Sequence, residues 1–238
     1  MRLADIPTTI ARDILKDQSL AERSTRLTPM TADARIAGPV RLIEFLPGRP
    51  ELRRPGTPAN FTAIDQTHPG EVLILAAAGD TAGAILGDML ATRAKHLGAA
   101  GALVDGAVRD LEGLAQAGLP VQAQAVRPMA AHQTLIPFAC DRPLRFAGVT
   151  VMPGDWVLAD ADGVLFLTPA LVDHLLARAG AAMAKDAFSR ELLLLGFPLA
   201  QVFPLPESLI PHLDDYRGSG RLDASAIAAT LSKTPPSP

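Results

Sequence analysis

Apolar runs that alternate with helix-like segments ending in glycine are the feature that most constrains the fold of this chain. Residues 71–77 (EVLILAA) form a continuous apolar run between turn residues, which is typical of a strand buried on both faces. A glycine-rich turn then leads into a helix predicted over residues 88–97 and ended by Gly98. Strand, helix and strand follow again within residues 101–128. This alternation predicts βαβ units and a mostly parallel sheet.

Within that region, a strand is expected at residues 101–105 (GALVD), with a turn at Gly106. A short helix closed by Gly118 and a strand within residues 119–128 complete the pattern.

The flanking segments differ from this pattern. A helix is predicted at residues 8–23, and a strand with Gly and Pro breaks at residues 34–48. Residues 144–168 hold short β-rich runs separated by PGD and ADADG, which predict hairpin-like turns. A long helix is predicted over residues 169–195, and the tail SKTPPSP is expected to be disordered. The predicted organisation is an N-terminal helical arm (1–33), one α/β core domain (34–168), and a C-terminal helix and tail (169–238).

Composition argues against several classes of protein. The net charge of −3 gives no general attraction to nucleic acid or anionic lipid, and the aromatic content of 4% offers little surface for stacked bases. Cys140 is the only cysteine, so no intrachain disulfide can form and the chain suits a reducing compartment. The N-terminus lacks the apolar core of a signal peptide, and the apolar runs are far shorter than the ~20 residues of a membrane span. We expect a cytoplasmic protein that binds neither nucleic acid nor membranes.

Charged residues interrupt the most apolar part of the chain. Gly87 and Asp88 stand where one predicted helix begins, and Arg109 and Asp110 follow the next predicted strand. Both pairs are expected at the carboxyl edge of the sheet, where open α/β sheets bind their ligands. Asp88 can offset the helix dipole, or the free amides at the same helix start can bind a carboxylate or phosphate. Both interpretations stay open.

Arg109 and Asp110 are neighbours in the chain, and adjacent side chains do not face one another well on a helix. A separate external partner for each is therefore expected in place of a local ion pair. An aspartate binds a hard divalent cation through oxygen, and an arginine binds a carboxylate or an enolate oxygen. Together they suit a metal-bound 2-oxo acid. Asp105, at the expected strand end, either supports this site or is a turn residue.

Other chemistry finds weaker support. His68 and His132 lack the spacing of zinc ligands, His96 is expected to be solvated, and Cys140 to be a buried free thiol. No lysine lies in an apolar strand, which disfavours imine chemistry. No nucleophile elbow, Walker motif or dinucleotide fingerprint is present. Residues 47–58 are expected to be a solvated loop, with its three arginines as an alternative contact for an anionic substrate or a neighbouring subunit.

Two blocks carry a resemblance to a known family: GDMLATRAKHLGAAGALVDGAVRD (87–110) and FAGVTVMPGDWVLADADGVLFL (146–167). Within the first block, Asp88, twenty intervening residues, Arg109 and Asp110 meet the signature D-x20-R-D. The chain thereby resembles the RraA-like family over roughly residues 34–196. That family includes 4-hydroxy-4-methyl-2-oxoglutarate aldolases and regulators of ribonuclease E activity.

The resemblance implies a swivelling-type β/β/α domain that forms trimers or hexamers with active sites between subunits. It also implies a class II aldolase site with Mg²⁺ or Mn²⁺, which releases pyruvate from a 4-hydroxy-2-oxo acid and also decarboxylates oxaloacetate. By resemblance, Asp110 would ligate the metal, Asp88 would hold metal-bound water, and Arg109 would bind the pyruvyl oxygen. The amides near Gly87, Met89 and Leu90 would face the substrate carboxylate; the supporting candidates are Asp105, Glu112 and, from a neighbouring chain's C-terminal helix, Asp186 or else Glu191.

One position departs from the family pattern. Aldolases of this family tend to carry an acid three residues after the Asp of the Arg-Asp pair, where this chain has Gly113 and places Glu112 one residue early. On a helix, that offset rotates the side chain by about 100°. Two alternatives to the aldolase therefore stay open. One is a non-catalytic regulator of the ribonuclease E type, and the other is a sugar-acid lyase or dehydratase whose acidic substrate contacts Arg49, Arg53 and Arg54.

Overall fold

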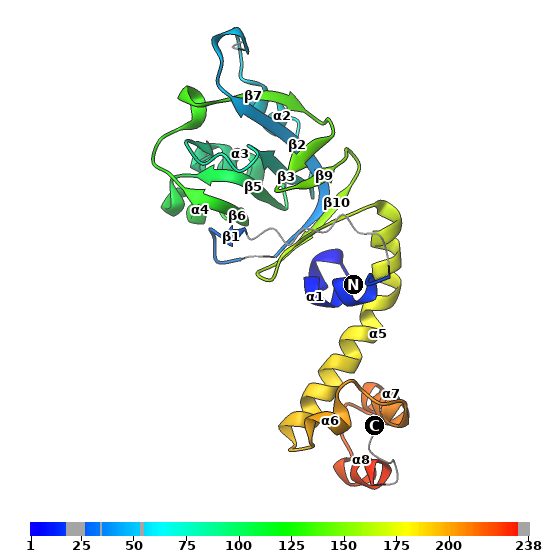
Figure 1. The fold of residues 1–238 in the computed structure, drawn as a ribbon. Coiled ribbons are helices and arrows are strands. Elements are labelled where there is room, and N and C mark those ends of the chain that lie inside the picture. Colours follow the sequence, from blue (N-terminus) through cyan, green and yellow to red (C-terminus); the bar gives the residue numbers. More distant parts are fainter. Residues whose placement is uncertain (18–26, 34, 53–54, 233–238) are drawn as a thin grey trace. The chain divides into compact units, whose positions relative to one another are not determined.

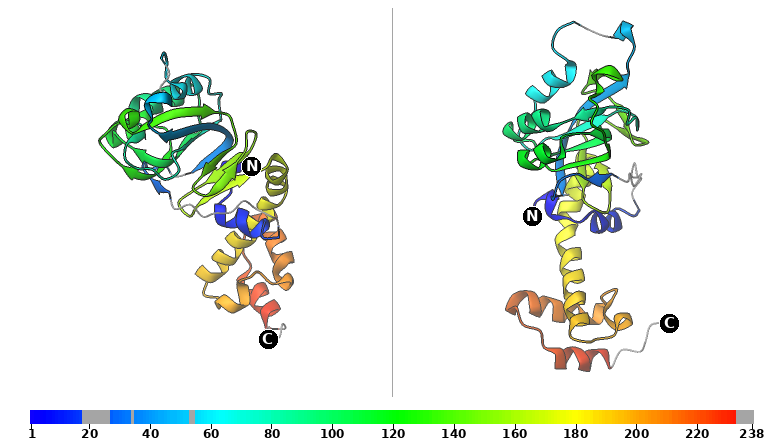
Figure 2. Two further views of the ribbon diagram at one scale, coloured as in Figure 1. Left: turned by 45° about the horizontal axis from the view of Figure 1, so that its top comes forward. Right: turned by 90° about the vertical axis from the view of Figure 1, so that its left-hand side faces the viewer.

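The computed structural model describes residues 1–17, 27–33, 35–52 and 55–232 (Figures 1 and 2). The chain divides into two compact units, Met1–Leu176 and Ala177–Pro238. In the part of the chain that is described, no helix combines the length and apolar character needed to cross a membrane.

A nine-stranded sheet, counted over the described residues, forms the centre of the first unit in the order β1-β6-β5-β3-β2-β10-β11, with β4 paired to β5 and β7 paired to β2. The pairs β2–β3, β3–β5, β4–β5 and β5–β6 are parallel, whereas β1, β7, β10 and β11 join antiparallel. The parallel pairing predicted for the alternating strands and helices is thus confirmed at the centre of the sheet, and the margins are antiparallel. The strands are β1 (Thr28–Pro29), β2 (Ile36–Pro47), β3 (Val72–Ala76), β4 (Ala84–Leu86), β5 (Gly101–Val108), β6 (Val121–Val126), β7 (Leu135–Cys140), β10 (Trp156–Ala159) and β11 (Val164–Leu167).

β2 is long enough to pair with three other strands, which explains why the sheet contains both parallel and antiparallel pairs. Its first residues pair with β10, its middle with β3 and its last residues with β7. The expected Gly and Pro breaks are absent, because Gly38 and Pro39 both lie within the strand. A Cβ at Gly38 would overlap the carbonyl oxygen of Gly70, so glycine lets these two backbone segments approach.

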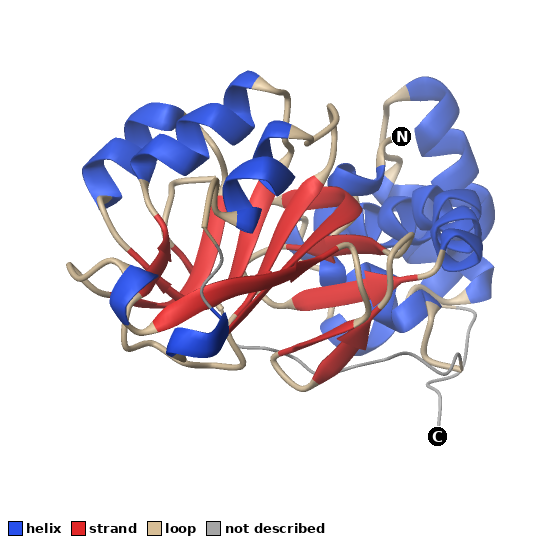
Figure 3. Cartoon of the chain, turned by 90° about the horizontal axis from the view of Figure 1, so that it is seen from above, coloured by secondary structure: helices blue, strands red, loops and turns tan. Residues whose placement is uncertain are grey.

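Alternation along β3 places its side chains in two separate cores. Leu73 and Leu75 pack with α2 (Ala59–Asp65), α3 (Asp88–His96) and α4 (Leu111–Ala117), and helices cover one face of the sheet in Figure 3. Val72, Ile74 and Ala76 pack instead with residues of β8 (Leu144–Phe146), β9 (Val149–Val151), β10 and β11. All five residues of β3 are buried, so the continuous apolar run follows from burial on both faces.

Two turns differ from expectation. β5 continues through Asp105 and Gly106 to Val108, and its register to β6 shifts between Val104 and Ala107, so an irregularity within the strand replaces the predicted turn. PGD does not close a hairpin, because β9 (Val149–Val151) pairs with β8 (Leu144–Phe146) in a separate two-stranded sheet. The hairpin at ADADG is confirmed between β10 and β11.

The helices at the two ends of the chain agree with the prediction in part. α1 (Thr8–Ile14) is shorter than predicted, and residues 18–23 of that prediction lie outside the described residues. α5 (Pro169–Leu194) confirms the long helix, whereas the predicted disorder of residues 233–238 also falls outside them. The second unit has a small core of its own, formed by Phe188, Leu192, Val202, Leu209, Leu213 and Ile227. The remaining helices are η1 (Leu3–Asp5), η2 (Pro50–Leu52), η3 (Ala131–Gln133), α6 (Leu199–Val202), η4 (Glu207–Leu209), α7 (Ile210–Ser219) and α8 (Ala224–Leu231).

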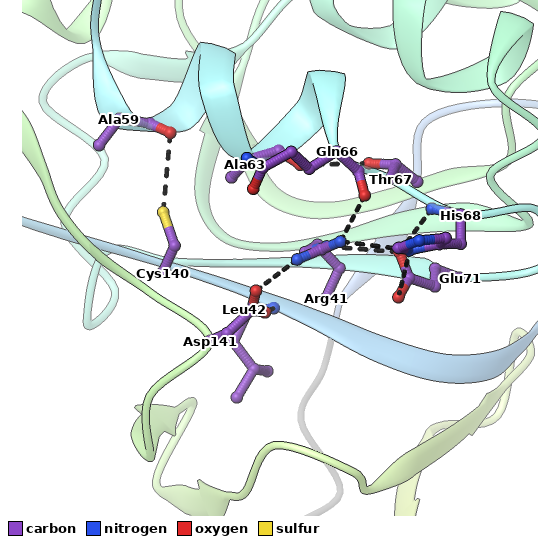
Figure 4. A network of polar contacts seen from close by, with 10 residues as sticks. All are labelled: Arg41, Leu42, Ala59, Ala63, Gln66, Thr67, His68, Glu71, Cys140 and Asp141. Carbon is purple, nitrogen blue, oxygen red and sulfur yellow. Dashed lines mark hydrogen bonds and ion pairs between the residues drawn. The ribbon is translucent and has the colours of Figure 1, made fainter.

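A buried arginine connects three elements of the first unit (Figure 4). The guanidinium of Arg41, on β2, donates to the carboxylates of Glu71 and Asp141 and to the backbone carbonyl of Gln66. Glu71 also accepts the amide of His68 at 2.7 Å. Arg41 is 8% exposed, so its charge is balanced by partners rather than by water.

Candidate functional site

Two neighbouring strands end side by side and position the predicted charged residues. β4 lies parallel to β5 with Leu86 opposite Val108, and the amide of Arg109 donates to the carbonyl of Leu86 at 3.0 Å. Gly87 and Asp88 therefore follow β4 where Arg109 and Asp110 follow β5. The structure brings these two pairs together at the carboxyl edge of the parallel strands.

Gly87 makes room for the second pair. A Cβ at Gly87 would lie 2.8 Å from Oδ2 of Asp110 and 3.2 Å from Nε of Arg109, closer than ordinary contacts. The side chains of Arg109 and Asp110 thus lie directly over the residue where α3 begins. Any larger residue at position 87 would displace them.

Arg109 and Asp110 form an ion pair, contrary to the expectation from the sequence. Nε of Arg109 lies 3.1 Å from Oδ2 of Asp110, with side chains 41% and 40% exposed. The expected lack of a local ion pair is wrong because Asp110 does not have helical backbone: it adopts a left-handed conformation, φ 58° and ψ 50°. Aspartate tolerates this conformation better than most residues, but it remains unusual and such backbone is often found at functional sites.

Asp110 precedes α4, yet its carboxylate does not cap the helix amides. An N-terminal aspartate would normally accept one of them. The carboxylate of Asp110 is instead half exposed and paired only partly, through one oxygen, with its neighbour Arg109. This arrangement leaves Asp110 able to take a ligand from outside the chain.

Asp88 is the first residue of α3, and its Oδ1 accepts the amide of Met89 at 2.7 Å. The interpretation of Asp88 as a helix-start residue is therefore supported, and the amide of Met89 is already engaged. The other face of Asp88 packs on Gly113, where a Cβ would lie 2.5 Å from Cβ and 2.9 Å from Oδ2 of Asp88. The missing acid at position 113 thus coincides with space that Asp88 occupies.

A cavity of about 750 Å³ opens beside these residues. Gly87, Asp88 and Arg109 form part of its wall, together with Met89 and Leu90. The rest of the wall is mostly apolar: Phe45, Leu52, Gly56, Thr57, Pro58, Ala59, Asn60, Phe61, Ala84, Ile85, Ala130, Ala131, His132, Leu135, Ile136, Pro137 and Phe138. These residues come from four separate segments, so no local pattern in the sequence could have revealed the cavity.

Asn60 is the polar residue that sequence reasoning missed. It is 7% exposed, lines the cavity and has no hydrogen-bond partner for its Oδ1. Buried acceptors without a partner are rare in folded proteins. An amide in the apolar stretch around α2 was the available signal in the sequence.

Asp105 lies in the interior of β5, not in a turn, and is 1% exposed. Its carboxylate accepts the amide of Ala147 at 2.8 Å and the side-chain amide of Gln124. Burial raises the pKa of Asp105, and the hydrogen bonds from Ala147 and Gly79 partly oppose that rise. These contacts connect Asp105 with the β8–β9 turn, and Asp105 does not line the cavity.

The other candidates lie apart from the cavity wall or remain predictions. Glu112 is exposed on α4 and accepts Nε2 of Gln116 at 3.5 Å. Asp186 and Glu191 lie on α5 in the second unit, and their contribution from a neighbouring chain stays a prediction. Arg49 pairs with Glu51 at 3.5 Å on the surface, whereas Arg53 and Arg54 lie outside the described residues.

The side chains of Cys140 and His96 differ in their exposure to solvent. Cys140 is half-buried, its Sγ lies 3.7 Å from the carbonyl oxygen of Ala59, and burial raises the pKa of its thiol. His96 is exposed on α3, as expected. Neither residue lines the cavity.

The donor set decides which metal could be held here. Over the described residues, no group of three or more His, Cys, Asp and Glu side chains is placed to hold a metal ion. Zinc prefers a nearly complete set of protein ligands, which this arrangement does not offer. Mg²⁺ commonly takes one or two carboxylates and keeps several waters. Asp110 with Asp88 nearby fits a hard cation of that kind.

The sequence pattern of the RraA-like family, described as aldolase/RraA, matches residues 8–166. A protein of Halalkalibacterium halodurans is 30% identical over 181 residues, 76% of this chain and 81% of its own, and its name provisionally assigns it as a 4-hydroxy-4-methyl-2-oxoglutarate aldolase. A protein of Burkholderia mallei with the same provisional name is 32% identical over 145 residues, 61% of this chain and 82% of its own.

Solved structures agree with the fold. RraAS2 of Streptomyces coelicolor, described as an unusual member of the RNase ES inhibitor RraA family, is 29% identical with a TM-score of 0.70 over 79% of this chain and 93% of its own. The RNA-processing inhibitor RraA from Thermus thermophilis is 29% identical with a TM-score of 0.55 over 68% of this chain and 92% of its own. Their similarity agrees with the mixed α/β fold of this chain, in which helices pack on a β-sheet. The chain therefore belongs to the RraA-like family of aldolases and RraA proteins.

Proposed function

We propose that the protein is a divalent-metal-dependent carbon–carbon lyase that cleaves a 4-hydroxy-2-oxo acid to pyruvate and a carbonyl compound. The observation that carries the proposal is the placement of Arg109 and Asp110 over Gly87, beside Asp88 and a mostly apolar cavity. Relatives that are named as aldolases support the class of reaction.

Asp110 is proposed to hold Mg²⁺ or Mn²⁺, since its carboxylate is half exposed and caps no helix. The bound ion would act as a Lewis acid on the substrate carbonyl. Asp88, whose Oδ1 is already engaged by the amide of Met89, would hold a water through Oδ2. That water can protonate the carbon from which the carbonyl fragment leaves.

Arg109 is proposed to bind the pyruvyl oxygen. Cleavage of the C–C bond would turn the substrate's 4-hydroxyl into the carbonyl group of the leaving fragment, with the hydroxyl proton passing to solvent, and would leave negative charge on the pyruvyl oxygen. A guanidinium stabilises such a charge in a partly desolvated site. The amides at the start of α3, near Gly87 and Leu90, would face the substrate carboxylate, since a helix N-terminus favours anions. Oxaloacetate decarboxylation leaves the same charge on the same oxygen, so the site should support that reaction as well.

The assembly is also part of the proposal. We propose that the chain forms trimers or hexamers and that Asp186, or else Glu191, reaches the site of a neighbouring copy. Both residues lie on α5, with Asp186 half-buried and Glu191 exposed within one chain. Analytical ultracentrifugation of the intact protein would give its oligomeric state. The variant Asp186→Asn should lower the activity and leave the oligomeric state unchanged.

Pyruvate release, measured with a coupled dehydrogenase, tests the reaction. We expect turnover with Mg²⁺, none with EDTA, and losses of about 100-fold or more in Arg109→Ala and Asp110→Asn. Lys95→Ala and Asp65→Asn remove a similar charge from exposed positions outside the cavity wall and should retain activity. Undiminished turnover in EDTA, or in both site variants, would contradict the proposal.

A second candidate is a protein-binding regulator of the ribonuclease inhibitor type. Two solved structures at 29% identity are described as inhibitors of RNA processing or of RNase ES, and Gly113 departs from the pattern of the aldolases. Calorimetric titration with oxalate, which imitates the pyruvate enolate, separates the two. A pure protein-binding module has no reason to bind oxalate in a Mg²⁺-dependent way.

A further inference from the structure

We infer that His132 is the base that removes the proton from the 4-hydroxyl group of the substrate during cleavage. The inference rests on the proposed function, which assigns residues to the oxo end of the substrate and names no acceptor for this proton. It adds a catalytic residue from another part of the cavity wall.

His132 lies in η3, and close contacts fix this segment against the start of β4. The amide of Ala84, the first residue of β4, donates to the carbonyl of Met129 at 2.8 Å. A Cβ at Gly83 would lie 2.7 Å from Cα of Ala131, so glycine allows the two backbone segments to approach. The residue next to His132 is therefore held against the chain that continues into β4.

β4 connects this position with the charged residues. Gly87 follows three residues after Ala84, which corresponds to about 10 Å of extended chain. Arg109 and Asp110 lie over Gly87, so they stand at one end of the short strand while η3 contacts the other end. Arg109 and His132 both line the cavity. The cavity thus has a charged end at Arg109 and a histidine in the wall beyond it.

The structure of the substrate places its hydroxyl in the same space. In a 4-hydroxy-2-oxo acid, C4 is two carbon–carbon bonds from the 2-oxo carbon. When the oxo group is bound at Arg109, the 4-hydroxyl extends into the cavity that His132 lines. A general base must come within hydrogen-bond reach of the proton that it removes, and a histidine on the wall of this cavity is suited to that role.

The chemistry of the other side chains favours His132. Among the described residues that line the cavity, the titratable side chains are those of Asp88, Arg109 and His132. An arginine keeps its proton in proteins, which excludes Arg109 as the base, and Arg53 and Arg54 as well. Asp88 is assigned to the water that protonates C3. A neutral imidazole, by contrast, has a ring nitrogen that accepts a proton.

The reaction balances with His132 in this role. Its ring nitrogen takes the 4-hydroxyl proton, and the electron pair of that O–H bond forms the new C=O bond at C4. The C3–C4 bond breaks, and its electron pair gives the pyruvate enolate that Arg109 stabilises. The water held by Asp88 then protonates C3. His132 is exposed, so the hydroxyl proton passes from its ring to solvent.

A comparison of two reactions tests the inference. Cleavage of 4-hydroxy-4-methyl-2-oxoglutarate, the substrate in the names of the relatives, requires removal of a hydroxyl proton. Decarboxylation of oxaloacetate does not, because oxaloacetate has no 4-hydroxyl. A general base contributes roughly 100- to 10,000-fold to a rate, so His132→Ala should lower kcat for cleavage at least about 100-fold and leave decarboxylation within about threefold, both measured with Mg²⁺.

A second variant separates proton transfer from hydrogen bonding. His132→Gln keeps a polar side chain that does not take up a proton, so it should lose cleavage as His132→Ala does. His96→Ala is the matched control, because His96 is exposed on α3 and lies outside the cavity wall. This control should retain both activities.

Three results would overturn the assignment of His132 while the lyase proposal stands. Equal losses of cleavage and decarboxylation in His132→Ala would mean that the residue shapes the site. A higher KM for the hydroxy acid with unchanged kcat would mean that it binds the substrate without taking the proton. Full cleavage by His132→Gln would mean that no proton is transferred to this position.

Failure of the proposed function gives a different result. If the unaltered protein carries out neither reaction with Mg²⁺, the proposed function itself fails. If it decarboxylates oxaloacetate and leaves the hydroxy acid intact, no base for the 4-hydroxyl operates in the site, and the inference is overturned.

Discussion

Replacing Gly113 by alanine tests whether the position of Asp88 matters. The new methyl carbon would lie 2.5 Å from Cβ of Asp88 and 2.9 Å from its Oδ2, whereas ordinary contacts begin at 3.4 Å. The nearest atom is Cβ, close to the backbone of α3, so rotation of the carboxylate alone cannot relieve the overlap. Asp88 must move by about 1 Å relative to Gly113, the difference between these distances.

The expected effect is large on activity and small on stability. A misplacement of about 1 Å can cost about 100-fold in rate, so kcat/KM for pyruvate release should fall by about that factor. Alanine is preferred over glycine in a helix by up to about 1 kcal/mol, which offsets part of the strain between α3 and α4. We therefore expect the free energy of unfolding to change by no more than about 1 kcal/mol.

The assay pairs turnover with urea unfolding. Gly180→Ala is the matched control, because Gly180 lies in α5 and a Cβ there has open space around it. This variant should keep full activity and gain about 0.5–1 kcal/mol of stability. Gly113→Glu, which restores the acid of the family's aldolases, should also lose activity. Full activity in Gly113→Ala would refute the claim that this glycine positions Asp88.

Three further predictions concern the buried polar groups. Arg41→Met should destabilise the protein by about 3–5 kcal/mol in urea unfolding, because it leaves Glu71, 18% exposed, and Asp141 without their cation; a loss below about 1 kcal/mol would show that the network contributes little. Burial raises the pKa of Asp105 above its ordinary 3.8, so the folded state binds the extra proton, and the stability contributed by this group is greatest in acid and decreases as pH rises through the folded pKa. Asp105→Asn should remove that decrease in unfolding free energy measured against pH, and an unchanged pH profile would contradict the assignment. Burial also raises the pKa of Cys140, so Ellman's reagent at neutral pH should react much more slowly with the folded than with the urea-unfolded protein, and equal rates would be inconsistent with the structure.

The central strands could be predicted because their local sequence matches their burial. Every residue of β3 is buried, so its continuous apolar run identifies it without knowledge of the neighbours. The same holds for the glycines that end helices: Gly98 and Gly118 both have positive φ, which few other residues adopt readily. At these positions, the local sequence was sufficient to predict the structure.

Other parts of the sheet could not be predicted because they depend on pairing between distant segments of the chain. β7 contains Pro137 and joins the last residues of β2 from a distant part of the chain. The extension of β5 through Asp105 requires partners at Ala147 and Gln124, which the sequence does not connect with it. The swivelling-type description of the domain stays a prediction.

Some features of the candidate site could likewise be predicted from the sequence, and others could not. The spacing of Asp88, Arg109 and Asp110 predicted that they would meet, because parallel strands end at a common edge. The ion pair of Arg109 and Asp110 depends on a left-handed residue that no spacing argument contains. The unpaired Oδ1 of Asn60 becomes visible only when the fold closes the cavity around it.

Calorimetric titration with oxalate, with and without Mg²⁺, tests the central claim most directly. If Arg109 and Asp110 bind a cation and an oxo acid together, the unaltered protein binds oxalate only with Mg²⁺, Asp110→Asn and Arg109→Ala lose that binding, and Asp65→Asn retains it. Oxalate affinity that is independent of Mg²⁺, or unchanged in Asp110→Asn, would contradict the account.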